Sequence, residues 1–256
     1  MFKVLAYIKF LLKSTNQHGV HSPFVYNLVT KCFYDNTNYE DYTKLKSYKN
    51  SLLNNKSKLE ITDFGAGSKI FKSNSRSVNR IAKHSGSTIK RAKLLYRLTT
   101  YFKPNSVLEL GTSLGIATQA MALGNSKSNI TSIEGCKNIS EFASQQLSNF
   151  KIDNVQLKTG VFNDVIPTLN QPEWDLIFFD GHHNKKATLN YFNMLVDTAQ
   201  NDSIFIFDDI HWSKEMTQAW EEIKQHHKAT VTIDTFFWGF VFFRKEQVKE
   251  HFTIRL

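Results

Sequence analysis

The stretch Val107-Leu-Glu-Leu-Gly-Thr-Ser-Leu-Gly115 decides the fold of this chain. It begins as a short apolar run and continues into a loop bounded by Gly111 and Gly115. Gly111 allows the chain to turn sharply, and Gly115 allows the next helix to approach closely. Ligands in open α/β sheets bind beyond the carboxyl ends of the strands, so this loop is the first candidate for a ligand site.

The spacing of this loop excludes two common nucleotide motifs. A dehydrogenase loop reads G-x-G-x-x-G, but position 113 is Ser and Gly115 comes four residues after Gly111. No G-K-[ST] follows, so the loop is not a P-loop. A second glycine-rich run, Asp63–Ser68, lacks the acid that should close a strand about 20–25 residues later. We interpret this run as a turn, or as a substrate-side loop that offers backbone amides.

Outward from the loop, apolar runs alternate with helical stretches. The strand-like runs are Val107–Leu110, Ile130–Glu134, Val155–Lys158, Leu176–Asp180 and Ser203–Asp208. This alternation predicts parallel strands joined by crossover helices, an open α/β sheet. The last two runs, Thr230–Asp234 and Phe237–Arg244, are separated by too little chain for a helix and are expected to pair antiparallel.

Composition limits the class of protein. The chain has 256 residues, enough for one large domain or for one domain with an extension. Its 13% aromatic content excludes a disordered chain, and two cysteines indicate a reducing compartment. No run of about 20 apolar residues is present. We therefore expect a cytoplasmic protein.

The charge is unevenly distributed along the chain. Residues 1–105 hold 19 Lys and Arg against 5 Asp and Glu, a net charge of +14. Residues 106–256 hold 13 against 18, a net charge of −5. A basic half attracts nucleic acid, an anionic membrane or an acidic small molecule, although a solvated lysine-rich surface has the same composition.

The front of the chain is expected to be a basic, helical extension or lid over residues 1–87, followed by a main domain over 88–256. Residues 1–13 place apolar side chains at helical spacing with three lysines between them. This amphipathic helix packs on its own domain or makes peripheral contact with a membrane. Ser22 followed by Pro23 predicts the start of a second helix over Phe24–Phe33.

Residues at the next strand ends suit an adenosine ligand. Glu134 closes the second strand 25 residues after Glu109, where a carboxylate accepts both hydrogen bonds of a ribose diol. The third strand ends in Gly160-Val161-Phe162, where an adenine can lie against backbone and apolar groups. The fourth strand ends in Asp180-Gly181.

With these motifs in this order, residues 88–245 resemble the class I S-adenosylmethionine-dependent methyltransferases. The resemblance implies a Rossmann-like, mostly parallel sheet of seven strands in the order 3-2-1-4-5-7-6, with helices on both faces. It implies that the loop cradles the methionine part of S-adenosylmethionine, that Glu134 holds the ribose and that Asp180 lies near the methyl group. The implied cofactor residues are Glu109, Gly111, Thr112, Ser113, Gly115, Glu134, Gly135, Gly160, Val161, Phe162 and Asp180. The alternative is a Rossmann-like domain with another nucleotide or none.

The run Asp180-Gly-His-His183, with Asp208-Asp209 after the fifth strand, resembles the metal-assisted O-methyltransferases of the catechol and sugar types. Asp180, Asp208 and Asp209 would then bind Mg²⁺, and the metal would lower the pKa of an acceptor hydroxyl. His183 would take the proton. Two departures are Asp209 in place of the catechol type's Asn, and His182 where sugar-type relatives often have an acid. Alternatively, Asp180 only binds the cofactor, and Asp208 or Asp209 caps the next helix.

The expected activity is O-methylation of a small hydroxylated molecule. Two alternatives stay open: an RNA or tRNA methyltransferase that uses the basic front as a platform, and a non-catalytic cofactor-binding or membrane-binding protein of the same fold. The run Asn16–Phe24 resembles the leader of uncharacterised bacterial methyltransferases, chiefly from Bacteroidota. That resemblance supports the family but supplies no acceptor.

Overall fold

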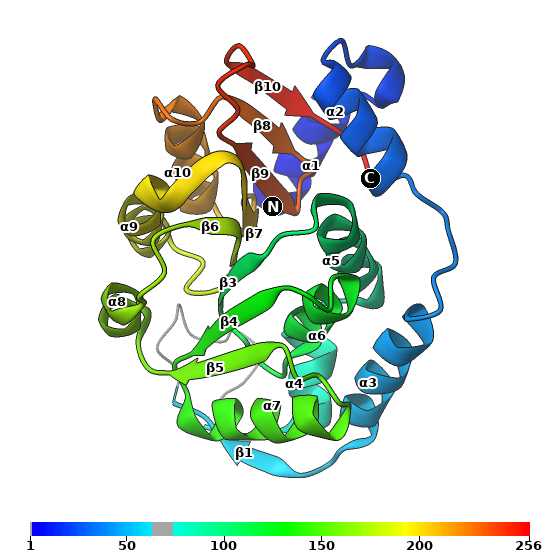
Figure 1. The fold of residues 1–256 in the computed structure, drawn as a ribbon, viewed down its shortest axis with the longest axis vertical. Coiled ribbons are helices and arrows are strands. Elements are labelled where there is room, and N and C mark those ends of the chain that lie inside the picture. Colours follow the sequence, from blue (N-terminus) through cyan, green and yellow to red (C-terminus); the bar gives the residue numbers. More distant parts are fainter. Residues whose placement is uncertain (1, 63–73) are drawn as a thin grey trace. The chain divides into compact units, whose positions relative to one another are not determined.

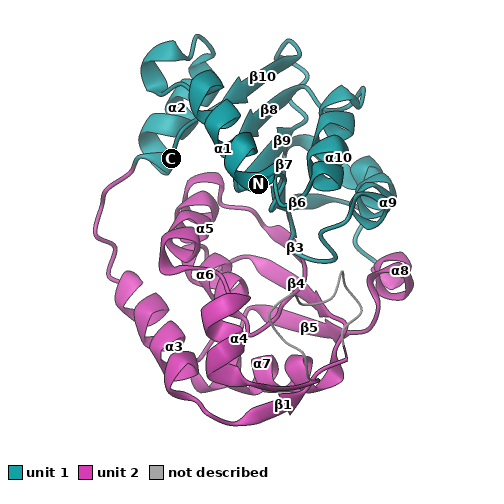
Figure 2. Cartoon of the chain, turned by 180° about the vertical axis from the view of Figure 1, so that it is seen from behind, with its two compact units in different colours: residues 1–34, 170–256 teal, residues 35–169 magenta. Residues whose placement is uncertain are grey.

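The computed structural model describes residues 2–62 and 74–256 (Figure 1). The chain divides into unit 1, residues 1–34 and 170–256, and unit 2, residues 35–169 (Figure 2). The boundary that we place between residues 87 and 88 stays a prediction. The glycine-rich run Asp63–Ser68 lies outside the described residues. Among the described helices, none has the length and apolar character needed to cross a membrane.

Unit 2 is built around three parallel strands in the order β3-β4-β5, as predicted for the first three strands of the sheet. A separate antiparallel pair joins β1 to β2. The elements of unit 2 are α3 (Tyr42–Asn54), β1 (Lys58–Glu60), β2 (Ser75–Ser77), α4 (Val78–His84), α5 (Ile89–Phe102), β3 (Ser106–Leu110), α6 (Ile116–Gly124), β4 (Asn129–Glu134), α7 (Lys137–Asn149), β5 (Val155–Thr159), α8 (Phe162–Val165) and the 3-10 turn η3 (Ile166–Thr168).

Local signals set the ends of α5, which delivers the chain to β3. The Thr88 hydroxyl accepts a hydrogen bond from the Arg91 amide (3.3 Å) and caps the first turn. At the other end, Lys103 adopts a left-handed conformation (φ 48°), and Pro104 cannot continue the helix. The strand that follows is buried from Val107 to Leu110. This buried strand therefore anchors the start of the candidate loop in the core.

Unit 1 contains five strands in the order β10-β8-β9-β7-β6. β6 and β7 are parallel, whereas β9 is antiparallel to both β7 and β8, which confirms the predicted terminal pair. The elements of unit 1 are α1 (Phe2–Lys13), η1 (Gln17–Gly19), α2 (Pro23–Leu28), η2 (Val29–Phe33), β6 (Trp174–Phe179), α9 (Lys185–Leu195), η4 (Val196–Thr198), β7 (Ala199–Asp208), α10 (Lys214–Gln225), β8 (Val231–Asp234), β9 (Trp238–Phe242) and β10 (Glu250–Thr253).

The edge strand β10 makes the prediction of seven strands wrong. Within the described residues, strands β3 to β10 number eight. β10 runs parallel to β8, and the Glu250 amide donates to the Thr230 carbonyl (2.8 Å). Beyond its end, Thr15 and Ile254 form an isolated parallel bridge. The run is short and polar, so it carries no strand signal; only pairing with β8 makes it a strand.

The core of unit 1 is aromatic. Phe179 at the end of β6 stacks on Phe207 of β7, with ring centroids 4.3 Å apart. Phe178 meets Trp238 of β9 edge to face at 5.6 Å. These side chains are buried, as expected for apolar runs in the interior of a parallel sheet. The packing fixes the positions at which β6 and β7 end, and therefore those of the polar residues that follow.

The second helix starts as predicted, but its second half is π-helical rather than α-helical. The Ser22 hydroxyl accepts from the Val25 amide (3.4 Å), with Pro23 in the first turn. The predicted helix over Phe24–Phe33 divides into the α-helix α2 and the π-helical turn η2. Within this segment the Thr30 hydroxyl donates to the Tyr26 carbonyl (2.8 Å). Such back-bonding competes with the regular ladder, and this is consistent with the wider turn.

We predict that Gly239→Ala destabilises the chain by about 1–3 kcal/mol through overpacking. A Cβ atom at Gly239 of β9 would lie 2.6 Å from the fully buried Trp220 ring of α10. Denaturant unfolding of Gly239→Ala, Trp220→Phe and the double variant measures the effect. Since Phe lacks the outer ring, the double variant should be more stable than the sum of the single effects. Strict additivity would contradict the contact.

Candidate functional site

The loop between β3 and α6 has a backbone that few sequences can adopt. Three of its residues are in the left-handed region: Gly111 (φ 109°), Ser113 (φ 49°) and Gly115 (φ 75°). A Cβ atom at Gly115 would lie 2.6 Å from the Tyr48 hydroxyl. Glycine is therefore required at Gly115 both for its φ and for the space it leaves. Ser113 carries a side chain in this region, which costs of order 1 kcal/mol.

Hydrogen bonds from neighbouring elements hold the loop in place. The amides of Gly111 and Thr112 both donate to the Ile133 carbonyl of β4 (2.9 and 3.3 Å). From α3, the buried Tyr48 hydroxyl donates to the Leu114 carbonyl (2.9 Å). The loop is thus preorganised by β4 and α3 before any ligand binds.

Glu134, at the end of β4, faces this loop. Its Oε2 accepts from the Ser113 amide (2.9 Å) and its Oε1 from the Cys136 amide (3.0 Å). The two amides orient the carboxylate toward the loop. This arrangement suits a ligand that presents a pair of hydroxyl groups.

Glu109 is fully buried beneath the loop, 0% exposed. Its Oε2 accepts from the hydroxyls of Thr118 on α6 and Ser132 on β4, both at 2.5 Å. The Ser132 hydroxyl also shares a hydrogen bond with that of Thr112 (2.6 Å). Burial raises the pKa of Glu109 to about 7, against the lowering effect of the two hydroxyls. Its Oε1 has no hydrogen-bond partner among residues 2–62 and 74–256.

The turn after β5 lies at the same end of the parallel strands as the β3–α6 loop and Glu134, an end that we call the cofactor edge. The Gly160 amide donates to the Glu134 carbonyl (2.9 Å), so the two strand ends are tied together. Gly160 has φ 154°, and a Cβ atom there would lie 2.8 Å from a Val165 methyl group. Phe162 begins α8 with its side chain buried. The structure therefore gathers the predicted cofactor residues of unit 2 at one edge: Glu109, Gly111, Thr112, Ser113, Gly115, Glu134, Gly135, Gly160, Val161 and Phe162.

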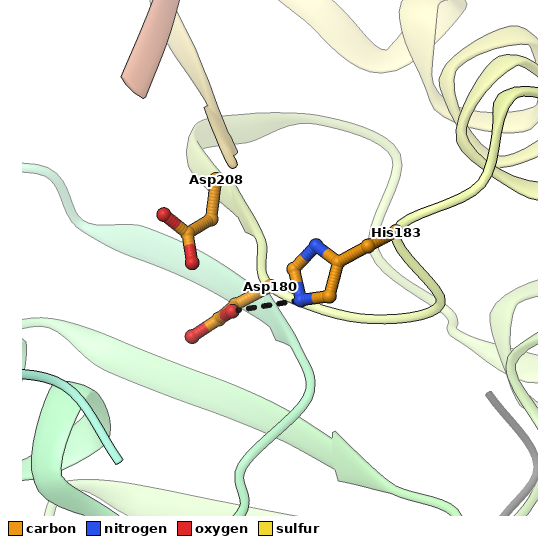
Figure 3. A group of neighbouring side chains, drawn as sticks. All are labelled: Asp180, His183 and Asp208. Atoms are coloured by element: carbon orange, nitrogen blue, oxygen red, sulfur yellow. Dashed lines mark ion pairs between the residues drawn. The ribbon is translucent and has the colours of Figure 1, made fainter. Parts of the chain in front are cut away.

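A second cluster lies in unit 1, where β6 and β7 end (Figure 3). Asp180 follows β6, Asp208 is the last residue of β7, and His183 lies in the loop after Asp180. One ligand atom from each lies within 4.8 Å of the others, and His183 Nε2 lies 3.6 Å from Asp180 Oδ1. Among the described residues this is the one group with the spacing of a metal site.

Asp209, which the sequence places with Asp180 and Asp208, is not in this group. Asp209 has a left-handed backbone (φ 53°), and its carbonyl accepts from the Trp212 amide (2.8 Å). The alternative in which Asp208 or Asp209 caps the next helix is wrong. The Ser213 hydroxyl fills that position and accepts from the Met216 amide (3.1 Å).

The neighbours of the cluster orient its members. The buried Asp208 accepts at Oδ1 from the Trp238 indole N–H (2.7 Å). In the loop before α9, His182 has φ 63° and shares a hydrogen bond with the Tyr191 hydroxyl (2.5 Å). The Asn184 side-chain Nδ2 donates to the His182 carbonyl (2.8 Å), while its side-chain oxygen caps α9. His183 is therefore held between two anchored residues.

Sequence reasoning missed one histidine pair, His211 with Asp234, because the residues are 23 positions apart. His211 Nε2 lies 2.8 Å from Asp234 Oδ2, and its Nδ1 lies 3.1 Å from the Thr217 hydroxyl. Its ring stacks on Phe236 at 5.2 Å. Both ring nitrogens are engaged within unit 1, so the contact is a structural link between the β7–α10 loop and the end of β8.

Comparisons with known proteins bear on the fold of the chain. Residues 108–210 match the model of a methyltransferase domain. Among solved structures, the chain is similar to a Podospora anserina methyltransferase, PaMTH1, bound to S-adenosylhomocysteine (TM-score 0.62, 13% identity, 88% of this chain and 97% of that one). It is also similar to the Streptomyces achromogenes O-methyltransferase TomG bound to S-adenosylmethionine (0.54, 17%, 62% and 81%).

A Bacillus cereus O-methyltransferase in complex with S-adenosylhomocysteine gives a similar match (TM-score 0.53, 18% identity, 61% of this chain and 82% of that one). No curated protein matches the sequence. Identities this low establish the fold alone. The chain has the α/β, Rossmann-like fold of the class I S-adenosylmethionine-dependent methyltransferases, as the resemblance implies.

We predict that Glu109 makes stability depend on pH. Its pKa is raised from 4.5 to about 7 by burial, so the native state holds a proton that the unfolded chain releases between these values. Glu109 therefore contributes stability below pH 4.5, and this is lost as the pH rises through 7. Glu109→Gln keeps an acceptor for the two hydroxyls without a charge.

Urea unfolding of the wild type and Glu109→Gln across this pH range tests the prediction. The stability of Glu109→Gln relative to the wild type should increase from pH 4.5 to 7, by on the order of 3 kcal/mol at most. Glu141→Gln, on an exposed glutamate of α7, is the control and should show no such trend. A difference that is independent of pH would contradict the raised pKa.

Proposed function

We propose that this protein is an S-adenosylmethionine-dependent methyltransferase that methylates an oxygen of a small hydroxylated molecule. The observation that carries the proposal is the contact between Glu134 Oε2 and the Ser113 amide (2.9 Å). It joins the carboxylate expected to hold a ribose to the loop expected to hold the methionine part. The family-model match and the cofactor-bound structural neighbours support this choice of cofactor.

Each part of this edge has a role in binding the cofactor. The Glu134 carboxylate, oriented by its backbone donors, accepts the ribose hydroxyls. Loop 111–115 leads into the N-terminus of α6, whose dipole favours the carboxylate of the methionine part. Gly160 and Val161 offer backbone groups to the adenine, and Gly135 completes the turn after Glu134. Thr112 and Glu109 act beneath the loop through the Ser132 hydroxyl.

The transfer itself is a displacement at carbon. Bound S-adenosylmethionine would supply the methyl group: the acceptor oxygen would bond to the methyl carbon as the carbon–sulfur bond breaks, and the electron pair of that bond would stay on sulfur. The acceptor proton must go to a base, and we propose His183 for this step, with Asp180 beside it. The 3.6 Å separation of the pair is an electrostatic contact rather than a hydrogen bond.

The donor set of the cluster in unit 1 fits a divalent cation. Asp180 and Asp208 supply carboxylate oxygens and His183 an imidazole nitrogen. The three ligand atoms lie within 4.8 Å of one another, close to the distance of about 4.2 Å between opposite ligands of Mg²⁺. Carboxylates favour Mg²⁺ and Mn²⁺, and the imidazole moves the preference toward Mn²⁺. A bound ion would lower the pKa of an acceptor hydroxyl.

Metal binding and proton transfer are competing roles for the same His183 nitrogen. A lone pair that binds a cation cannot accept a proton from the acceptor. The proposal therefore has two forms: His183 as ligand with a metal-activated hydroxyl, or His183 as base without a metal. Dependence of activity on the cation separates them.

We predict that S-adenosylmethionine and S-adenosylhomocysteine bind the wild type, and that Glu134→Ala weakens both by about 1–3 kcal/mol, roughly 5- to 150-fold in Kd. The loss has two parts, the ribose contact and the loop contact through Ser113. Isothermal titration calorimetry measures it, and Glu141→Ala, on an exposed glutamate of α7, is the matched control. Absence of binding to the folded wild type would overturn the proposed function.

We predict that Mn²⁺ binds to the cluster defined by the structure rather than to the set predicted from the sequence. Asp180→Asn and Asp208→Asn should each weaken Mn²⁺ binding about tenfold or more, because each removes a charged ligand. Asp209→Asn should leave binding unchanged, and Asn tolerates its left-handed backbone. Titration followed by electron paramagnetic resonance measures free Mn²⁺. If Asp209→Asn weakened Mn²⁺ binding equally, the ligand set predicted from the sequence would be the correct one. If the wild type did not bind Mn²⁺, the metal proposal would be wrong.

A further inference from the structure

Exposed apolar side chains are concentrated on α1. Of the twelve large hydrophobic residues that are exposed in the described part of the chain, six lie on this twelve-residue helix. They are Phe2, Val4, Leu5, Tyr7, Ile8 and Leu12. Isolated exposed apolar residues need no explanation, but a concentration on one helix indicates an interaction surface.

α1 has two apolar faces: one packs on Phe236 of unit 1, and the other carries exposed side chains. On the covered face, Phe10 is buried and lies 5.5 Å from the Phe236 ring, centroid to centroid. On the opposite face, Leu5, Ile8 and Leu12 recur at helical spacing and are 51%, 48% and 83% exposed. We refer to these three residues as the outer face of α1. A helix that needed only to pack on unit 1 would carry polar residues there.

Positive charge accompanies this outer face. The three charged residues of α1 are Lys3, Lys9 and Lys13, and the chain holds no Asp or Glu before Asp35. Lys9 and Lys13 are exposed. Lysines beside an exposed apolar stripe are typical of helices that lie in the interface of an anionic membrane.

Two exposed aromatic residues lie beside α1 in unit 1. The Lys3 ammonium group lies 4.3 Å from the centre of the Trp212 ring, which is 42% exposed. Phe237, 44% exposed, follows the Phe236 ring on which α1 packs. Aromatic rings of this kind favour the headgroup region of a bilayer. The surface thus combines apolar, basic and aromatic groups.

We propose that α1 docks this protein on an anionic lipid membrane, with its outer face in the headgroup–acyl boundary and its lysines on the phosphates. A second copy of the chain fits the surface less well. A symmetric dimer across α1 would bring the lysines of two helices together with no acid in either segment to neutralise them. A helix of about 18 Å is too short to cross the bilayer, so it lies in the interface.

Vesicle flotation of the full chain tests the proposal. The vesicles are phosphatidylcholine alone, or phosphatidylcholine with about 30 mol% phosphatidylserine. The wild type should bind the anionic vesicles, and binding should fall as salt screens the lysines. The triple variant Leu5→Ser/Ile8→Ser/Leu12→Ser should weaken it about tenfold or more, and so should Lys9→Glu/Lys13→Glu. Val248→Ser, at a residue 73% exposed, is the control and should bind like the wild type.

Several outcomes would overturn the proposal. The first is a wild type that stays with the soluble fraction in the presence of anionic vesicles. Another is a triple variant that binds as tightly as the wild type. A wild type that elutes as a dimer, and a triple variant that elutes as a monomer, would assign the outer face to self-association. Thermal unfolding checks that the variants are folded. If the triple variant is not folded, vesicle binding by Lys9→Glu/Lys13→Glu tests the proposal instead.

Discussion

The buried carboxyl group of Glu109 is the interaction on which the cofactor edge depends. Its Oε2 accepts hydroxyl groups from α6 and β4, and the β4 hydroxyl of Ser132 also reaches Thr112 in the loop. One carboxyl oxygen therefore connects strand, helix and loop. Burial favours the neutral form of this group and raises its pKa to about 7, whereas the two hydroxyl donors favour the ionised form. The shape of the loop therefore depends in part on buried groups that lie beneath it.

Both units follow the same rule of parallel sheets: polar residues lie where the buried strands end. In unit 2 the ends of β3, β4 and β5 carry a glycine-bounded loop and Glu134. In unit 1 the ends of β6 and β7 carry Asp180 and Asp208. Apolar strand interiors fix the backbone, and the first residues beyond each strand are free to be polar. In the function that we propose, the residues of unit 2 serve the cofactor, and those of unit 1 serve a cation or proton transfer.

The basic front of the chain serves more than one purpose. Lys49 is buried in α3 and donates to the carbonyls of Ala82 (2.6 Å) and Ser87 (2.9 Å), so its charge supports the end of α4. Burial lowers its pKa to about 8. The lysines of α1 instead accompany an exposed apolar face. The net charge of residues 1–105 therefore does not describe one continuous surface, and a nucleic-acid platform is only one interpretation of it.

The sequence by itself determined the strand–helix alternation, the loop at 111–115 and the polar residues at the strand ends, because periodicity and glycine spacing are local. Tertiary structure decided the rest. β10 is a strand only because β8 pairs with it, and Asp208 is oriented by Trp238, 30 residues away. His183 rather than Asp209 joins Asp180 and Asp208, since the left-handed backbone at Asp209 turns the chain there. Contacts between distant residues depend on register and turn geometry, which no local pattern specifies.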